Sequence, residues 1–462
     1  MSVQHTESLS ADYFVSAPVG EVFLKTAGPL VIVLAMSGLL TLVDGVFVGH
    51  YLGDEALAAV SLSFPVTMLM TALSTLVGGG MASLMARRLG AHQYEQASTI
   101  FAGAHGLALM VSALLISVGL IFGPGFLTAI TAGNVILADL AQTFLWPLLL
   151  GSPVSFLLGV HADALRSEGR TQEIALLSVL INLLNIATNW LALAVLGLGI
   201  VGAALGTVVA QGIGLILLLA LRSRRPSKLA LPWTLKSWTS EWPSLLGLGL
   251  PLCLGFLGLG LTSASVLMAL RGQAGPDFEA IVAAYGGVTR LLGFAFLPAL
   301  ALAMASQSLC GQAVGSGQPD RAQYALKLAM RVAFCWSAAV ALTGLFAGET
   351  LGRWFSQDPL VIQTVARILR PMMLLYAVSG PVLVLALYFQ ALGQPGRTAL
   401  LTLVKPWLLM PILIFGSTVW WGEPGLWLAF PMADLGVLVL ALWLLKTALR
   451  KVQPLAKVER SA

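Results

Sequence analysis

Charged residues are scarce in this chain. Only 10% of its 462 residues are Asp, Glu, Lys or Arg, against about a quarter in ordinary soluble domains. A soluble protein of this length needs far more polar surface, and the high hydrophobic fraction of 58% argues against it equally. Apolar stretches long enough to cross a bilayer recur, whereas the strands of membrane barrels alternate over about ten residues. The sequence therefore predicts an all-α integral membrane protein.

The usual signatures of metal sites and of membrane-embedded enzymes are also missing. The three cysteines, Cys253, Cys310 and Cys335, lie in apolar segments without CxxC spacing, and the five histidines form no HExxH or paired-ligand pattern. No DDxxD-like cluster is present to hold a metal-bound diphosphate. We therefore expect no metal, no cofactor, no catalytic residues and no enzymatic activity. Basic residues sit mostly in short loops, so we expect no nucleic-acid partner.

Apolar runs punctuated by glycine, proline and charge predict twelve membrane-spanning helices. Their approximate limits are 27–52, 56–86, 97–123, 134–161, 172–196, 199–222, 243–270, 281–312, 324–347, 359–391, 398–421 and 425–448. The first run is too long for the core of a cleaved signal peptide, so it is expected to remain in the protein.

Arginine and lysine are distributed unequally between alternate loops. The loops after spans 2, 4 and 6 and the C-terminal tail hold most of them, whereas the other loops hold only Arg271 and Arg353. The positive-inside rule then places both termini in the cytoplasm, and we expect a multi-pass protein of the cytoplasmic (inner) membrane. The predicted domains are a cytoplasmic N-terminal segment 1–24, an N-lobe 25–222, a basic linker 223–242, a C-lobe 243–449 and a basic tail 450–462.

The two halves resemble each other. ALRSEGRT (164–171) after span 4 matches ALGQPGRT (391–398) after span 10, and RLGAHQYEQA (88–97) after span 2 matches AVGSGQPDRA (313–322) after span 8. Because each repeat has six spans, both halves enter the membrane in the same sense. Parallel repeats of this type are typical of transporters whose halves rock about a central cleft.

Asp44 is a carboxylate inside an apolar spanning helix. It lies nine residues before Gly53, about 13 Å from the helix end at 1.5 Å per residue. A charge at such depth costs about 2.5–3.5 kcal/mol on insertion scales and therefore suggests a function. By the same measure Asn185, Asn189 and Thr207 lie at one level with Asp44 and can form a polar cluster with it.

The chemistry of this cluster fits an ion-coupled cycle. A buried carboxylate without a cation favours its neutral form, so Asp44 could bind a proton on the outside and release it inside. A sodium ion held by the carboxylate, amide and hydroxyl oxygens is an alternative. A cluster of hydrogen-bonded polar residues with a purely structural role is another. The residue types do not decide between them.

The second half carries intramembrane charges of its own, namely Arg290, Arg367, Arg370, Lys405 and Asp434. Arg290 and Asp434 each lie nine residues from the outer start of their spans, so an Arg290–Asp434 pair is possible. A stabilising salt bridge explains such a pair at least as well as a functional role. Spans 8 and 10 are longer than a bilayer requires, so an alternative position for their arginines is the outer interface.

Several segments along the whole chain resemble the multidrug and toxic compound extrusion (MATE) family. They include VDGVFVGHYLGDEALAAV, MARRLGAHQYEQA, GIVGAALGTVVAQ, ALYFQALGQPGRTALL and LAFPMADLGVL. The resemblance implies two six-helix lobes around a V-shaped cleft. It also implies antiport of amphipathic, often cationic organic compounds, driven by influx of protons or sodium ions.

Residue by residue, Asp44 falls on the first-helix aspartate of the DinF-like branch, and Pro29 on the proline where that helix is thought to bend. Asn185 and Thr207 match the partners of the aspartate, whereas Asn189 replaces a second aspartate of related exporters. One carboxylate favours a single proton on Asp44. A flippase or exporter of lipid-linked or anionic amphipathic substrates is the alternative. We expect a monomer whose only other partner is membrane lipid.

Overall fold

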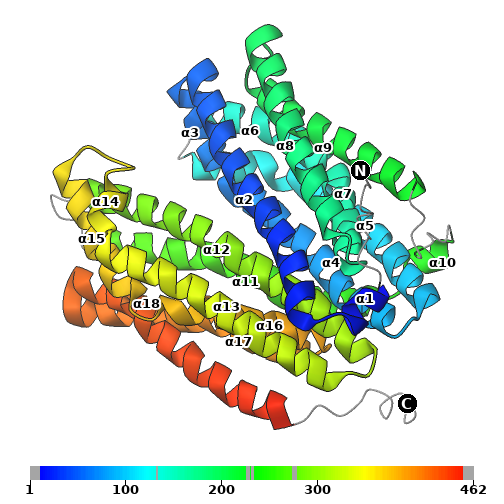
Figure 1. Ribbon diagram of the computed structural model, residues 1–462. Coiled ribbons are helices and arrows are strands. Elements are labelled where there is room, and N and C mark those ends of the chain that lie inside the picture. The colour runs from blue at the N-terminus through cyan, green and yellow to red at the C-terminus, as the bar shows by residue number, and fades with distance from the viewer. Residues whose placement is uncertain (1–10, 132–133, 225–228, 230–233, 273–277, 451–462) are drawn as a thin grey trace, which may run out of the picture. The chain divides into compact units, whose positions relative to one another are not determined.

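The computed structural model of the protein describes residues 11–131, 134–224, 229, 234–272 and 278–450 (Figure 1). Within these ranges the chain forms helices and no strand. The cytoplasmic tail predicted from the sequence lies outside the described residues beyond Arg450, as do residues 1–10 of the predicted N-terminal segment and most of 225–233 in the predicted linker.

The helices follow one another with short connections. They are α1 (Ala11–Ser16), α2 (Val19–Leu52), α3 (Asp54–Leu62), α4 (Phe64–Gly90), α5 (Tyr94–Ile130), α6 (Val135–Leu150), α7 (Ser152–Ser167), α8 (Thr171–Trp190), η1 (Leu191–Val195), α9 (Gly199–Arg224), α10 (Leu235–Trp238), α11 (Trp242–Arg271), α12 (Phe278–Gly315), α13 (Pro319–Phe346), α14 (Gly348–Gly352), α15 (Pro359–Met373), η2 (Tyr376–Val378), α16 (Ser379–Ala391), α17 (Pro395–Leu403), η3 (Val404–Leu409) and α18 (Met410–Arg450).

The number of spans agrees with the sequence. Nine described helical segments are long and apolar enough to cross a membrane, and two bent pairs, α6 with α7 and α15 with α16, provide one span each. The segment Pro395–Lys446 is 52 residues long and contains a non-helical residue, Gly422, with φ 64° and ψ −150°. Because this residue divides the segment into two spans, the described chain has the twelve that were predicted.

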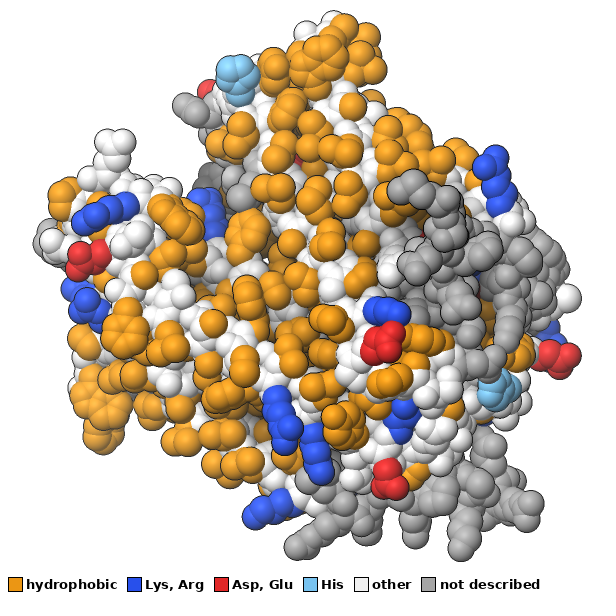
Figure 2. Space-filling model, in the orientation of Figure 1, with side chains coloured by type: hydrophobic (Ala, Val, Ile, Leu, Met, Phe, Trp, Pro, Cys, Tyr) orange, Lys and Arg blue, Asp and Glu red, His pale blue; other side chains and the backbone are white. Residues whose placement is uncertain are grey.

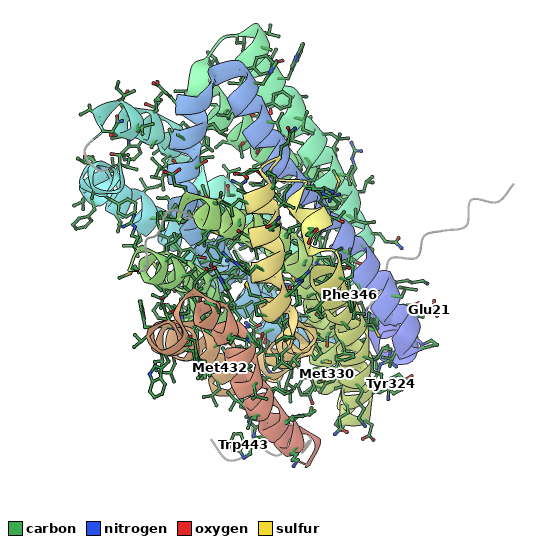
Figure 3. All side chains as sticks on the ribbon, turned by 90° about the vertical axis from the view of Figure 1, so that its left-hand side faces the viewer. Glu21, Tyr324, Met330, Phe346, Met432 and Trp443 are labelled. Atoms are coloured by element: carbon green, nitrogen blue, oxygen red, sulfur yellow. The ribbon has the colours of Figure 1, made fainter. Side chains whose placement is uncertain are left out.

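Apolar side chains cover much of the visible surface (Figure 2). On α13, Tyr324 near one end is 59% exposed and Phe346 at the other is 84% exposed (Figure 3). Trp443 on α18 is 60% exposed. Large apolar side chains do not remain in water over such areas, and a bilayer provides the surroundings that they require.

The chain divides into two compact units. Unit 1 contains Met1–Tyr13 and Gly28–Leu250, and unit 2 contains Phe14–Ala27 and Pro251–Ala462. Two of the three boundaries fall within a long helix and next to a proline, at Pro29 in α2 and at Pro251 in α11. A proline inside a helix removes one backbone hydrogen bond and weakens the helix at that place.

Close packing explains why the helices α2 and α11 begin in one unit and continue in the other. At Gly249 of α11, a Cβ atom would lie 1.8 Å from the carbonyl oxygen of Leu76 in α4, so only glycine permits this approach within unit 1. Ahead of α2, the Arg321 guanidinium of α13 donates to the carbonyl oxygens of Phe14 and Ala17, at 2.6 and 2.5 Å, within unit 2.

Four short turns reveal the internal repeat. In each, one residue with positive φ follows a helix, and the next residue donates its N–H to a carbonyl five residues earlier. The positive-φ residues are His92, Gly169, Gly317 and Gly393. Such a turn satisfies the last carbonyls of a helix. The match of His92 with Gly317 agrees with the sequence register. By contrast, Gly169 occupies the turn position of Gly393, three residues away from Gly396 with which the sequence match pairs it.

Candidate functional site

Asp44 of α2 accepts a hydrogen bond from Asn189 of α8. The Asn189 Nδ2 atom lies 2.9 Å from Asp44 Oδ1 and 3.0 Å from Asn185 Oδ1, one turn earlier on α8. Both asparagines are buried, and Asp44 is half-buried. No described cationic side chain forms an ion pair with Asp44, so no residue in this part of the chain compensates its charge.

The hydrogen bonds of this cluster have a defined direction. The Thr207 hydroxyl of α9 donates to the carbonyl oxygen of Ala203 at 3.2 Å, so its oxygen accepts from Asn185 Nδ2 at 3.1 Å. The Asn185 oxygen therefore faces Asn189, whose amide nitrogen donates to it and to Asp44. The series of hydrogen bonds thus ends at Asp44 Oδ1, which accepts from Asn189, and Asp44 Oδ2 has no described partner.

Gly206 of α9 makes room for Asn189. A Cβ atom at position 206 would lie 2.1 Å from Asn189 Oδ1 and 3.1 Å from its Cγ. The carbonyl oxygen of Gly206 also accepts a hydrogen bond from Thr188 at 2.9 Å. Asn189 Oδ1 is buried and accepts no hydrogen bond from a described residue. Close contact with the glycine therefore fixes the orientation of Asn189 toward Asp44.

The structure thus brings together the four residues Asp44, Asn185, Asn189 and Thr207 that the sequence predicts at one level. Gly206 and Thr188 belong to the same cluster and were missed. Both could have been predicted from the sequence as members of the cluster, because Gly206 directly precedes Thr207 and Thr188 lies between the two asparagines. Pro29, predicted as a bend, lies inside α2, whose helix continues on both sides of it.

In unit 2 the carboxylate of Asp434 pairs with Lys405 and not with Arg290, which corrects the pair considered from the sequence. The Lys405 ammonium of η3 donates to Asp434 Oδ1 of α18. Arg290 is exposed on α12 and has no described ion-pair partner. Equal depth placed Arg290 and Asp434 at one level, but depth does not say which face of a helix a residue occupies.

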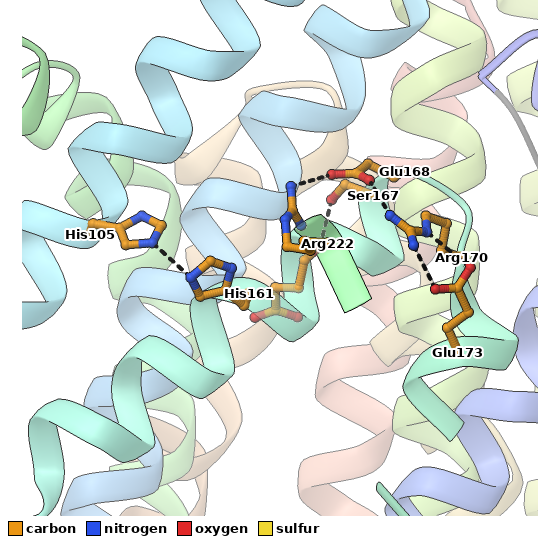
Figure 4. A network of polar contacts seen from close by, with 8 residues as sticks. His105, His161, Ser167, Glu168, Arg170, Glu173 and Arg222 are labelled. Atoms are coloured by element: carbon orange, nitrogen blue, oxygen red, sulfur yellow. Dashed lines mark hydrogen bonds and ion pairs between the residues drawn. The ribbon is translucent and has the colours of Figure 1, made fainter. Parts of the chain in front are cut away.

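A second polar network in unit 1 joins α7, α8 and α9 at the end of α7 (Figure 4). Arg222 Nη2 donates to Glu168 Oε1 at 2.8 Å, and Arg170 Nη2 lies 2.6 Å from Glu173 Oε2. Near it, the Nε2 atoms of His105 and His161 lie 3.1 Å apart. No joint role for these residues was predicted from the sequence. The network ties three helices together at the side predicted to be cytoplasmic.

Comparison with known sequences places this geometry in a family. The MatE family profile matches residues 29–191 and 259–414, once in each half. The chain belongs to the MatE family. Among its relatives, a "FAD transporter" of Shewanella oneidensis is 29% identical over 91% of this chain and 93% of its own. A "Probable multidrug resistance protein YoeA" of Bacillus subtilis is 24% identical over 65% of each chain.

The fold is likewise that of solved MATE transporters. A multidrug resistance MATE family transporter of the MOP superfamily, solved in an outward-facing conformation, has a TM-score of 0.87 to this chain. It covers 97% of this chain and 99% of its own at 23% identity. The MatE chain is therefore a multi-pass membrane transporter and not an enzyme. The predictions of family, fold class and transport are confirmed.

Proposed function

We propose that this MatE protein is a secondary antiporter that exports amphipathic organic compounds from the cytoplasm across the inner membrane, driven by proton influx through Asp44. The single observation that supports this most is a half-buried carboxylate with no cationic partner among the described residues. Such a group in a spanning helix exchanges its charge by binding and releasing a cation.

The hydrogen bonds favour a proton over sodium. A sodium ion at Asp44 requires further oxygen ligands, yet the neighbour that faces the carboxylate offers the amide nitrogen of Asn189 at 2.9 Å. The oxygens of Asn185 and Thr207 already accept hydrogen bonds within the cluster. Asp44 Oδ2 is therefore the atom to which a proton adds, while Oδ1 keeps the bond from Asn189.

The transport cycle follows from this exchange. Protonation from the outside neutralises Asp44 and removes the charge that its Asn189 contact stabilises. After the site opens to the inside, the proton leaves from Oδ2 and the carboxylate regains its charge. The prolines at the unit boundaries, Pro29 and Pro251, are the places where α2 and α11 most easily bend during alternating access.

A second candidate concerns the substrate and is favoured by one finding. The relative named "FAD transporter" matches nearly the full length of this chain, which supports an anionic amphipath as an alternative to cationic drugs. Both candidates use the same coupling site in unit 1, and they differ only in what is carried outward.

Proteoliposomes with a proton gradient or a sodium gradient imposed separately test the coupling. Transport of ethidium, a cationic dye, and of FAD is measured for the wild type, for Asp44→Asn and for Asp139→Asn as a matched control. Asp139 is exposed and lies near the start of α6. We expect proton-driven transport to vanish in Asp44→Asn and to persist in Asp139→Asn. Undiminished proton-driven transport by Asp44→Asn would refute the proposal.

A further inference from the structure

One exposed stripe of α13 changes from polar to apolar along its length. Tyr324, Lys327 and Arg331 are exposed at intervals of three and four residues, so they share one face of the helix. Further along the same face, Leu342 and Phe346 are also exposed, at 55% and 84% (Figure 3). Because large apolar side chains do not remain in water, this stripe is turned toward lipid.

The length of the stripe matches the thickness of a bilayer. Phe346 follows Tyr324 by 22 residues, or about 33 Å at 1.5 Å per residue, and a hydrocarbon core is about 30 Å thick. The amphipathic ring of Tyr324 suits the interface on the predicted cytoplasmic side. By the same measure, Lys327 lies about 5 Å and Arg331 about 11 Å further into the membrane. Long basic side chains near the end of a span extend toward the headgroups.

The two basic side chains of the stripe have no described acidic partner. Asp320 lies on the same face, but it precedes Lys327 by seven residues, or about 10 Å along the helix. Arg321 already donates to two backbone carbonyl oxygens of the segment before α2, so its charge is used elsewhere. The stripe therefore presents an ammonium and a guanidinium group, one turn apart, whose charges no described residue compensates.

We propose that Lys327 and Arg331 bind the phosphate of an anionic phospholipid, of which phosphatidylglycerol is the type, from the leaflet on the predicted cytoplasmic side. A guanidinium group matches two phosphate oxygens, and an ammonium group adds a second positive charge. Basic clusters on the cytoplasmic side of spanning helices are typical binding sites for anionic headgroups. The acyl chains then extend over the apolar residues that follow, such as Phe334, which is 50% exposed.

The net charge of the lipid is the property that this site distinguishes. Phosphatidylcholine carries the same phosphate but also a positive charge of its own, which two further cations repel. Phosphatidylglycerol carries the phosphate charge alone. The inference goes beyond the proposed transport function, because it gives unit 2 a bound lipid that is neither the exported compound nor the coupling ion at Asp44.

Cys335 provides a native probe of the stripe. It follows Arg331 by four residues, and it is exposed, whereas Cys253 and Cys310 are buried. It lies about 16 Å inside the start of the stripe, which is near the middle of the bilayer. Bromine atoms midway along the acyl chains of a lipid lie at this level. A bimane fluorophore attached to Cys335 is therefore quenched by a brominated lipid that is bound on the stripe.

The test places the labelled protein in phosphatidylcholine vesicles that contain a small fraction of brominated phosphatidylglycerol or of brominated phosphatidylcholine. We expect quenching of the wild type to show at least about a tenfold preference for phosphatidylglycerol. Each basic residue near an anionic headgroup contributes about fivefold, or about 1 kcal/mol. Lys327→Gln and Arg331→Gln should therefore each lower the preference about fivefold, and the double variant should be quenched equally by both lipids.

The control is the double variant Arg271→Gln, Arg353→Gln, which removes two exposed cations of unit 2 from the predicted outer side. We expect it to keep the preference of the wild type, and the same is expected of Lys327→Arg, which conserves the charge. The melting temperature of each variant identifies those that are folded.

Three results would overturn the inference. The first is equal quenching of the wild type by the two brominated lipids, which requires no variant. The second is a preference that survives in the double variant of Lys327 and Arg331. The third is an equal loss of preference in the control variant, because the effect would then reflect the net charge of the protein and not a site on α13.

Discussion

Gly206→Ala tests the coupling cluster without altering any of its polar groups. The new Cβ atom would lie 2.1 Å from Asn189 Oδ1, far inside van der Waals contact. Because α9 and α8 pack tightly, the Asn189 side chain must turn away, and its hydrogen bonds of 2.9 Å to Asp44 and 3.0 Å to Asn185 are lost. Overpacking of this kind costs about 1–3 kcal/mol.

The expected effect on transport is a shift in pH dependence. The amide of Asn189 stabilises the ionised carboxylate of Asp44, and a hydrogen bond to a charged group contributes about 1.5–3 kcal/mol. Loss of this bond changes the relative stability of the two protonation states of Asp44. We therefore expect the midpoint of the pH profile of transport to differ from that of the wild type.

The assay measures initial transport rates in proteoliposomes over a series of pH values at a constant pH difference across the membrane. Gly212→Ala is the control, because it makes the same change on α9 at a position with no atom within 4 Å of the new Cβ. A purely structural defect would lower the rate or the melting temperature of Gly206→Ala without moving the midpoint. If the Gly206→Ala profile has the midpoint of the wild type, the coupling role of Asn189 is wrong.

Two further substitutions test the charges of each unit. Asn189→Asp places a second carboxylate beside Asp44, and because two adjacent carboxylates do not ionise together, we expect the pH profile of transport to move upward and broaden; an unaltered profile in proteoliposomes would contradict the position of Asn189 in the site. Lys405→Met leaves the buried Asp434 without its partner and should lower the free energy of unfolding by about 3 kcal/mol. The double variant Lys405→Met, Asp434→Asn should recover most of the lost stability in a thermal-unfolding assay. If it does not, loss of the ion pair does not explain the lower stability of Lys405→Met.

The sequence predicts the spanning helices well because each must satisfy a bilayer about 30 Å thick, and length with apolar content is enough to recognise them. It also predicts the Asp44 cluster, since Asn185 and Asn189 lie on the regular part of α8, where residues four apart share a face. The sequence match pairs Gly169 with Gly396, three residues away from its structural counterpart Gly393. The match follows identical residue types, whereas the turn is defined by the residue that has positive φ.

The partner of Asp434 was missed for a different physical reason. Lys405 lies in η3, a π-helical stretch whose wider turns rotate the following residues away from the faces that regular helical spacing assigns. Depth along a span can be counted from the sequence, but the rotation of a helix that contains such a stretch cannot. Arg290 lies at the same predicted depth as Asp434 but does not pair with it, because depth does not give the direction in which a side chain points.

The two carboxylates, finally, differ in the one property that matters for coupling. Asp434 has a lysine on its Oδ1 atom, so its charge is compensated within unit 2 and no external cation is required. Among the described residues, Asp44 has only the neutral amide of Asn189 as its partner, so its charge is compensated only when a cation arrives. The two residues are not equivalent in the repeat, because Asp44 lies in the first span and Asp434 in the last. Unit 2 keeps a fixed ion pair here, whereas unit 1 keeps an exchangeable charge. This difference is why we assign the proton to unit 1.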